Sequence, residues 1–501
     1  MIIEKKTNNR KTKSMKTFIL SLTLGSLVLW SCSEEKKNSK SDLPPDELVR
    51  KEAFKDHSDS IPKDRTEFFK LNADYPRIQP GVGFKLINDF NEKITVQNAE
   101  KYVSGLKDYA SPLITKMINE KDKFSAKDVG WFHEPWMGSK RDPIMGTYPG
   151  NPNSAGTFKG INKNQEGFVL VLYDPLAAFT IGEVFDKNGN VPLEIDSAYF
   201  KSSKPINSFI SVDLNKDKGQ FKEGSVIVKF AFSELNGDQW PDMKDAPLFT
   251  IYNQLDAKSK DSYRNRYDYK KVSLFQIDVV VKDSKAAPET GWVFTTFVYD
   301  KNIKSNNILD KFVPLGAMWG MDPEVDSDFA TVEVQNQKLT QTWINDNAPY
   351  YSRETLGWGG RLSGPNDGAV ALQGVVDVTS KGVTKTDTIA RLPMTSCMSC
   401  HSPSQQQISS FLLPSSNQGA TFFNYNTPEF LRYNRNLKGE SFDPGQFSFD
   451  YNMAMNFKSM NAYLAFLNKY YKSKNSGMMK SSRGSEEYED SFEEFRRKKI
   501  D

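Results

Sequence analysis

A chain of 501 residues is long enough for two or three domains with a sizeable buried core. Apolar residues make up 38% of it and charged residues 26%, which is typical of a folded protein with polar linkers. The 66 basic and 63 acidic residues nearly cancel, leaving a net charge of +3. Because no basic stripe is present, the sequence lacks the electrostatic signature of a protein that binds nucleic acid.

The N-terminus has the pattern of a bacterial lipoprotein signal over residues 1–31. A lysine follows Met15, and an apolar run of about 13 residues extends from Phe18 to Trp30, too short for a bilayer core that needs roughly 20. Cys32 comes directly after "LWS" and resembles the lipid-modified cysteine of a lipobox. We therefore expect a lipid-anchored protein, in the periplasm or at the outer membrane or surface of a Gram-negative bacterium, that contacts the membrane through Cys32.

Two segments precede the region of strands. Residues 32–65 are charged and poor in large apolar side chains, as expected for a flexible linker. Residues 66–149 are predicted to be helical or irregular, with a helix at 96–120 that Pro112 interrupts.

From residue 150 the pattern changes to that of strands. Runs rich in Val, Ile, Phe and Thr, bounded by turn residues, occur at 167–174, 225–234, 272–283, 291–300 and 310–320. These runs predict an antiparallel, β-rich central domain over 150–345, similar to a sandwich or a strongly bent sheet. The predicted fold class is therefore α+β.

The remainder is predicted to be a C-terminal, mostly irregular and helical haem-binding segment over 346–472, followed by a charged tail over 473–501. An amphipathic helix is expected at 457–471, where apolar residues recur at helical spacing. The tail alternates blocks of charge and is predicted to be solvated.

The central motif of this segment is C-x-x-C-H, formed by Cys397, Cys400 and His401. It is the attachment sequence of c-type haem, in which two cysteines bind the haem covalently and the histidine ligates the iron. The pattern could also be a redox-active or disulfide-bonded cysteine pair, or a bare metal site. Haem attachment takes place outside the cytosol, so the predicted compartment agrees with one haem c as the cofactor.

The sixth iron ligand is left open by the sequence. Met453 and Met455 follow the motif at a distance typical of cytochromes with methionine ligation, but they can equally be ordinary buried methionines. His133 lies in "GWFHEPWMGS" with Arg141 close by, and is a third candidate unless it is a packed core histidine. His133 and Arg141 are also the candidate catalytic residues if a small-molecule substrate binds there.

Five strings in order resemble a bacterial and fungal family of monohaem c-type cytochrome-like proteins. They are 131–137, "TGWVFTTFVYD" at 290–300, "FVPLGAMWGMDP" at 312–323, "LGWGGRLSGPND" at 356–367 and "SCMSCHSPS" at 396–404. The resemblance implies haem binding by Cys397, Cys400 and His401. It also favours a functional role for His133 over that of a packed core histidine. Met145 stands where that family often has a second histidine, which weakens the case for a two-histidine catalytic site.

Two functional classes fit these features. The first is an electron carrier that passes single electrons between redox partner proteins. The second is a haem c-dependent enzyme, similar to a peroxidase or an oxidase, with a substrate pocket near His133. The sequence favours electron transfer without deciding between them.

Overall fold

The computed structural model describes residues 64–81, 92–135, 141–150, 157–163, 165–185, 219–254, 267–325, 339–367, 374–380, 383–389, 395–406 and 428–456, with a few single residues and short pieces between them. The chain divides into two compact units, residues 1–43 and 44–501, and everything described belongs to the second. The predicted signal peptide, Cys32, the helix at 457–471 and the charged tail lie outside the described residues.

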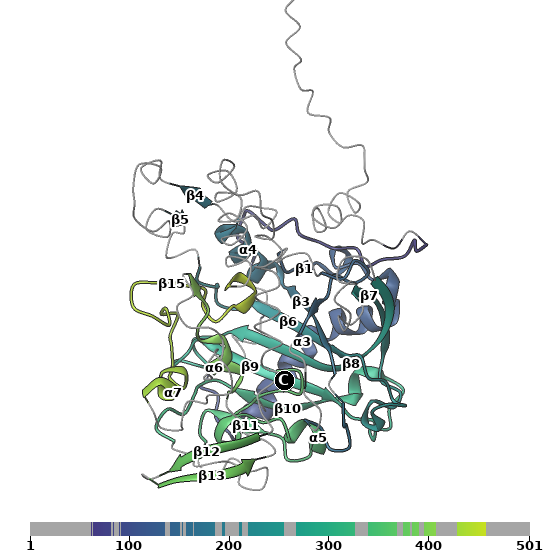
Figure 1. Cartoon of the computed structure of the whole chain (residues 1–501). Helices are drawn as coiled ribbons and strands as arrows, with labels where there is room; N and C mark the ends of the chain where they lie inside the picture. Colours follow the sequence, from purple (N-terminus) through teal and green to yellow (C-terminus); the bar gives the residue numbers. More distant parts are fainter. Residues whose placement is uncertain are drawn as a thin grey trace, which may run out of the picture. The chain divides into compact units, whose positions relative to one another are not determined.

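The second unit is built on an antiparallel sheet of nine strands (Figure 1). Seven strands form a path in the order β1-β3-β6-β8-β9-β10-β11, while β2 pairs with β3 and β7 pairs with β8. Their bounds are β1 Phe132–His133, β2 Tyr148–Pro149, β3 Gly167–Tyr173, β6 Val226–Ser233, β7 Leu248–Gln254, β8 Tyr267–Lys282, β9 Trp292–Tyr299, β10 Phe312–Met318 and β11 Thr342–Ile344.

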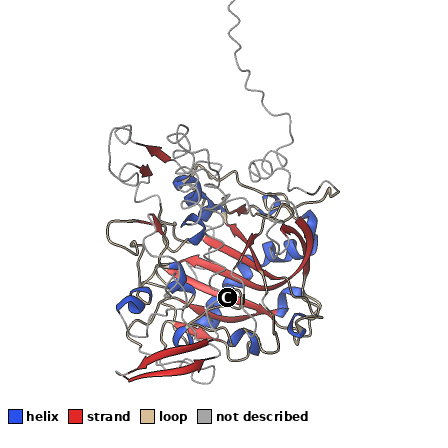
Figure 2. Ribbon diagram, in the orientation of Figure 1, coloured by secondary structure: helices blue, strands red, loops and turns tan. Residues whose placement is uncertain are grey.

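Helices and small hairpins surround this sheet (Figure 2). The α-helices are α3 Ala99–Glu120, α4 Pro175–Val184, α5 Tyr350–Arg353, α6 Cys397–His401 and α7 Pro428–Tyr433. Short 3₁₀ turns lie at Lys121–Lys123, Lys127–Val129, Pro241–Met243, Ile308–Lys311 and Trp358–Gly360. The two-stranded pairs are β4 Leu193–Ile195 with β5 Ile210–Val212, β12 Gly374–Ser380 with β13 Val383–Ile389, and β14 Gln405–Gln406 with β15 Phe447–Ser448.

The prediction of an α+β protein with an antiparallel, β-rich core is confirmed. The five predicted strand runs correspond to β3, β6, β8, β9 and β10. The sheet begins before residue 150, because β1 and β2 pair with β3. Within the described ranges no second large sheet packs on the first, so the expected sandwich is not seen there.

Helix α3 covers one face of the sheet. Its apolar side, including Leu106, Leu113 and Met117, is fully buried, whereas Pro112 and Asp108 are exposed. Pro112 lacks the N–H that would bond to the Asp108 carbonyl, and on the exposed side water can satisfy that carbonyl. The helix therefore continues through Pro112 without the predicted interruption.

Strand register separates the residues of the sheet into two faces. Tyr173, Ile227, Val280 and Phe294 form one cross-strand row and therefore share a face, here called the motif face. Leu172, Val228, Val279 and Thr295 form the neighbouring row and share the opposite face, here called the α3 face. In Figure 1, α3 passes behind the strands and α6 lies in front of them.

Candidate haem-binding site

Helix α6 presents the cysteine and histidine motif on one side. Cys397, Cys400 and His401 are spaced i, i+3 and i+4, which places them on the same helical face. All three are partly exposed, whereas Met398 and Ser399 between them are fully buried. The helix thus packs most deeply through Met398 and Ser399, and its motif side is less completely buried.

A capping box fixes where α6 begins. The Ser399 N–H donates to the Ser396 hydroxyl oxygen, and the Ser396 N–H donates to the Ser399 hydroxyl oxygen at 2.7 Å. The Cys397 N–H donates to the Leu362 carbonyl at 2.9 Å, which ties the helix to the glycine-rich stretch 356–367. A side chain at Gly357 would place its Cβ 1.9 Å from the Thr395 carbonyl oxygen, so only glycine permits this approach.

The imidazole of His401 is oriented by the backbone of a distant segment. Its Nδ1 lies 2.7 Å from the carbonyl oxygen of Tyr451, and because a carbonyl can only accept, Nδ1 carries the hydrogen. Nε2 is then the atom with a lone pair for a metal. Burial lowers the pKa of His401 to about 4, so the ring is neutral at pH 7, as a metal ligand must be.

The segment that supplies this carbonyl is held against the motif by several contacts. β14, just after the motif, pairs with β15, and the Phe449 N–H donates to the Ser404 carbonyl at 3.0 Å. The Phe294 ring packs edge-on against the His401 ring with centroids 5.0 Å apart. Because Phe294 belongs to the motif face, α6 lies on that side of the sheet.

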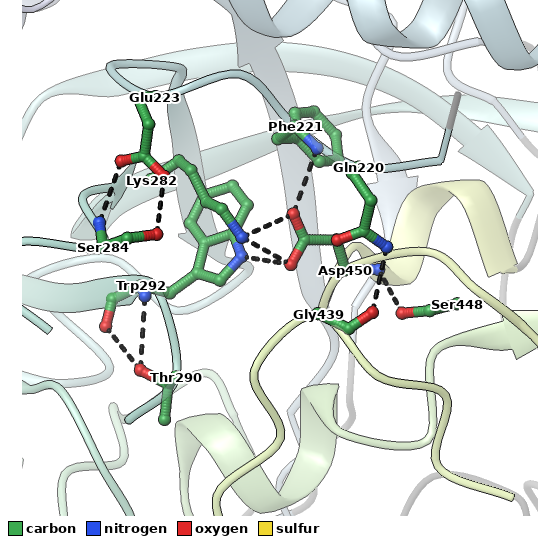
Figure 3. Close-up of polar contacts among 10 residues, drawn as sticks. All are labelled: Gln220, Phe221, Glu223, Lys282, Ser284, Thr290, Trp292, Gly439, Ser448 and Asp450. Atoms are coloured by element: carbon green, nitrogen blue, oxygen red, sulfur yellow. Dashed lines mark hydrogen bonds and ion pairs between the residues drawn. The ribbon is translucent and has the colours of Figure 1, made fainter. Parts of the chain in front are cut away.

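A buried ion pair anchors the same segment to the sheet (Figure 3). Asp450 accepts from Lys282 Nζ at 2.8 and 2.9 Å, from Trp292 Nε1 at 2.8 Å and from the Phe221 N–H at 3.0 Å. Asp450 and Tyr451 both have positive φ angles, 49° and 65°, which are strained for residues other than glycine. The four contacts to Asp450 hold this turn, and the turn points the Tyr451 carbonyl at His401.

A second charged cluster lies close to the motif on the same face. Lys229 on β6 pairs with Asp278 at 2.8 Å and with Asp367 at 2.5 Å, and Thr296 donates to Asp278 at 2.7 Å. Burial raises the pKa of Cys397 well above its usual range, and the nearby Asp367 and Asp278 raise it further. A redox-active cysteine pair needs a thiol of lowered pKa, so this environment counts against a thioredoxin-like role for the motif.

Neither a disulfide nor a bare metal site finds support in the described residues. Cys397 and Cys400 are not joined to each other. In the same part of the chain no group of three or more His, Cys, Asp or Glu side chains is placed to hold a bare metal ion. Both cysteines lie within about one helical turn of His401, at the spacing of the haem attachment motif.

The motif face of the sheet carries partly exposed apolar side chains. Partly exposed apolar side chains alternate with buried ones along β3 and β6 and continue onto β1 and β8. They all lie on the motif face, and they are Phe132, Val169, Val171, Ile227 and Val280. These partly buried side chains pack against the core and leave the motif face incompletely covered at these strands.

Met453 and Met455 follow Tyr451, whose carbonyl bonds His401, by two and four residues. Met455 is fully buried in the core, whereas Met453 is partly exposed. Both remain candidates for the sixth ligand.

The structure does not bring His133 to the motif. His133 pairs with Leu172 and therefore belongs to the α3 face, opposite the face on which Phe294 contacts His401. Its Nδ1 accepts the Asn72 N–H at 3.2 Å, which assigns the ring hydrogen to Nε2. The ring lies 1% exposed. This is the environment of a packed core histidine.

Arg141 lies on the motif side of the sheet. It contacts Glu134, which was not among the residues predicted from the sequence. The Glu134 N–H donates to the Val171 carbonyl, so Glu134 extends the register of β1 onto the motif face. Arg141 Nη1 donates to the Glu134 carbonyl at 3.3 Å. Burial raises the pKa of Glu134 to about 8, although the nearby Arg141 works in the opposite direction.

The raised pKa predicts a pH dependence of stability that Glu134→Gln removes. The folded protein keeps this proton up to about pH 8, whereas an unfolded glutamate releases it near pH ~4.3. The free energy of unfolding should therefore fall between those values as pH rises, by as much as about 5 kcal/mol from this group. Urea unfolding at several pH values should give a flatter profile for Glu134→Gln. The exposed Glu92→Gln should leave the wild-type profile unchanged, and two identical profiles for Glu134→Gln and wild type would contradict the prediction.

The comparisons with known proteins add no assignment. No family model, no curated protein and no solved structure matches this chain. Within the described part of the chain no helix is long and apolar enough to cross a membrane.

Proposed function

We propose that this protein is a monohaem c-type protein that transfers electrons outside the cytosol. Cys397 and Cys400 would bind the haem covalently and His401 would ligate its iron. The observation that carries the proposal is the hydrogen bond from His401 Nδ1 to the Tyr451 carbonyl. It leaves Nε2 available on the same partly exposed helical face as the two thiols.

The bound haem would supply a one-electron couple at its iron. The contribution of the chain is to hold and shield that group. The Tyr451 carbonyl keeps the imidazole in one orientation and increases its basicity as a ligand. The partly exposed apolar side chains of the motif face would exclude water from one side of the porphyrin, which favours electron transfer without bound solvent.

The N-terminal sequence supports the proposed cellular setting. A lipid on Cys32 would anchor the protein to a periplasmic or outer membrane surface of a Gram-negative bacterium, within reach of redox partner proteins. The chain's almost balanced charge offers no strong field for steering a highly charged partner.

A haem c-dependent enzyme is the second candidate, and one observation favours it. His133, one of the three candidates for the sixth position, lies on the face of the sheet opposite to the one on which Phe294 contacts His401. With His133 excluded by its face, and if neither Met453 nor Met455 binds, the iron would have a position open to a small molecule. An open position is typical of haem enzymes such as peroxidases.

Carbon monoxide binding separates the two candidates. The mature protein, purified from a host that matures c-type cytochromes, should keep its haem through extraction with acidified acetone; loss of the haem there would end the proposal. If the protein is an electron carrier with a filled sixth position, the reduced haem should resist carbon monoxide. Rapid formation of the carbon monoxide complex would instead support the enzyme.

The same preparation tests the methionines. A methionine ligand gives the oxidised protein a weak near-infrared band, which Met453→Ala or Met455→Ala should abolish if either binds iron. His133→Ala should leave the haem spectrum unchanged, because His133 is on the α3 face. A change from low to high spin in His133→Ala would contradict that placement.

A further inference from the structure

A buried carboxylate stands on the motif face beside the residue that contacts His401. Asp278 on β8 is 7% exposed and pairs in register with Thr296 on β9. Phe294 precedes Thr296 by two residues, so Asp278 and Phe294 are diagonal neighbours on one face, about 7–8 Å apart. Because the Phe294 and His401 ring centroids are 5.0 Å apart, Asp278 lies within roughly 13 Å of the His401 ring.

Hydrogen-bond donors converge on both oxygens of Asp278. Lys229 Nζ lies 2.8 Å from Oδ2, and the Thr296 hydroxyl donates to Oδ1 at 2.7 Å. Gln276 Nε2 lies 2.9 Å from each oxygen. The Asn366 N–H donates to Gln276 Oε1 at 2.8 Å, which assigns Nε2 as the donor end of that amide. These donors favour the ionised form of Asp278.

The same contacts connect Asp278 to the start of α6. Lys229 also pairs with Asp367 at 2.5 Å, and Asp367 accepts the Gly364 N–H at 3.0 Å. The Cys397 N–H bonds the Leu362 carbonyl in that glycine-rich stretch. The charged cluster and the motif helix are therefore fixed to one piece of backbone.

The negative charge of the cluster is felt at the motif. Burial raises the pKa of Cys397 well above its usual range, Asp367 and Asp278 raise it further, and Lys229 opposes them. His401 is neutral at pH 7 and adds no charge of its own. A charge that acts on the Cys397 thiol also acts on any group bound there.

The ionisation of Asp278 depends on its surroundings. Burial raises its pKa above the ordinary value of an aspartate, Lys229 lowers it and Asp367 raises it. Val171 on β3 and Thr296 on β9 flank the cluster in register and are uncharged. Asp278 should therefore carry its full charge at pH 9 and lose part of it toward pH 4.

We propose that the carboxylate of Asp278 lowers the reduction potential of the haem bound at the motif. The proposal rests on the proposed function. Oxidised haem carries one more positive charge than reduced haem, so a nearby negative charge stabilises the oxidised form. At an effective dielectric constant of about 20 and roughly 13 Å, one charge changes this equilibrium about tenfold, which is about 59 mV for one electron.

A redox titration of the holoprotein from pH 4 to pH 9 tests the proposal. At pH 9 the potential of Asp278→Asn should exceed that of wild type by about 59 mV, a tenfold shift. The difference should shrink toward pH 4, because wild-type Asp278 also loses charge there.

Asp142→Asn is the matched control for the redox titration. Asp142 is a buried carboxylate that accepts the Tyr252 N–H at 2.7 Å. Tyr252 pairs with Tyr269, nine residues or about 30 Å along β8 from Asp278. Asp142→Asn should therefore leave the potential at the wild-type value.

A second measurement does not require haem. The full chain is made in a host without cytochrome c maturation, and its folding is checked by circular dichroism. Alkylation of Cys397 by iodoacetamide at pH 8 is followed by peptide mass spectrometry. Asp278→Asn should lower the pKa of Cys397 and speed alkylation at least twofold, whereas Asp142→Asn should not.

Equal potentials of Asp278→Asn and wild type at pH 9 would overturn the proposal. A difference as large at pH 4 as at pH 9 would also overturn it, since it would reflect altered packing. If Asp278→Asn does not fold, Asp278→Ser is measured in its place. Absence of covalent haem from wild type would refute the proposed function alone, and equal alkylation rates would then show that the charge of Asp278 does not reach the motif.

Discussion

Replacing both Cys397 and Cys400 by serine is expected to abolish covalent haem attachment. Both thiols lie on the partly exposed face of α6 and neither is in a disulfide, so each is available to add to a haem vinyl group. Serine keeps the size and the helix while removing the sulfur. The haem content, measured as the pyridine haemochrome after acid–acetone extraction, should fall from one per chain to none.

Single-cysteine variants and a control variant test whether both cysteines bind the haem. Cys397→Ser or Cys400→Ser alone should leave one thioether, with a red-shifted haemochrome and a lower yield. Cys32→Ser should keep the full haem content and lose membrane partitioning, since it removes only the predicted lipid site. Covalent haem in the double variant would refute the assignment of the motif.

Replacing Asp450 by asparagine is expected to cause a large loss of stability. The variant leaves the Lys282 ammonium buried at 8% exposure with no carboxylate, and breaking a buried pair from one side typically costs about 3–5 kcal/mol. Asparagine tolerates the positive φ of this position, so the loss would come from the charge and not from the backbone. Urea unfolding at fixed pH and salt measures it.

A double-mutant cycle separates the pair from its surroundings. Lys282→Met together with Asp450→Asn should recover much of the stability, because the unpaired ammonium is gone. The surface pair of Lys301 and Asp242 is a control, and Asp242→Asn should cost no more than about 1 kcal/mol. An Asp450→Asn variant as stable as wild type would show that the buried pair does not anchor the turn.

The sequence predicted the parts of the fold that have a strong local pattern. Long β-branched runs predicted the five central strands, since a strand with a buried face needs such residues along its length. The two-residue strands β1 and β2 carry no such pattern and exist only because they pair with β3. The five-residue helix α6 was not predicted, although its capping serines, Ser396 and Ser399, were a usable signal.

The candidate site was predictable only where its residues are adjacent in sequence. The C-x-x-C-H spacing was sufficient to predict Cys397, Cys400 and His401 as candidate site residues. Asp450 and Lys282 are 168 residues apart, and nothing near either one indicates the other. Glu134 stands beside the predicted His133, but the register of β1 with β3 decides that Glu134 and not His133 lies on the motif face.

The hydrogen bond between His401 and Tyr451 joins residues 50 positions apart. This limits which fragments of the protein can retain the site. A graft of residues 393–404 into another scaffold would carry the C-x-x-C-H motif without the carbonyl that orients the histidine. Adding residues 443–456 would carry the carbonyl without Lys282 and Trp292, which brace its turn from the sheet. Unlike a small cytochrome that can be moved as a cassette, this site belongs to the whole second unit, so truncations and fusions should be designed around residues 64–456 intact.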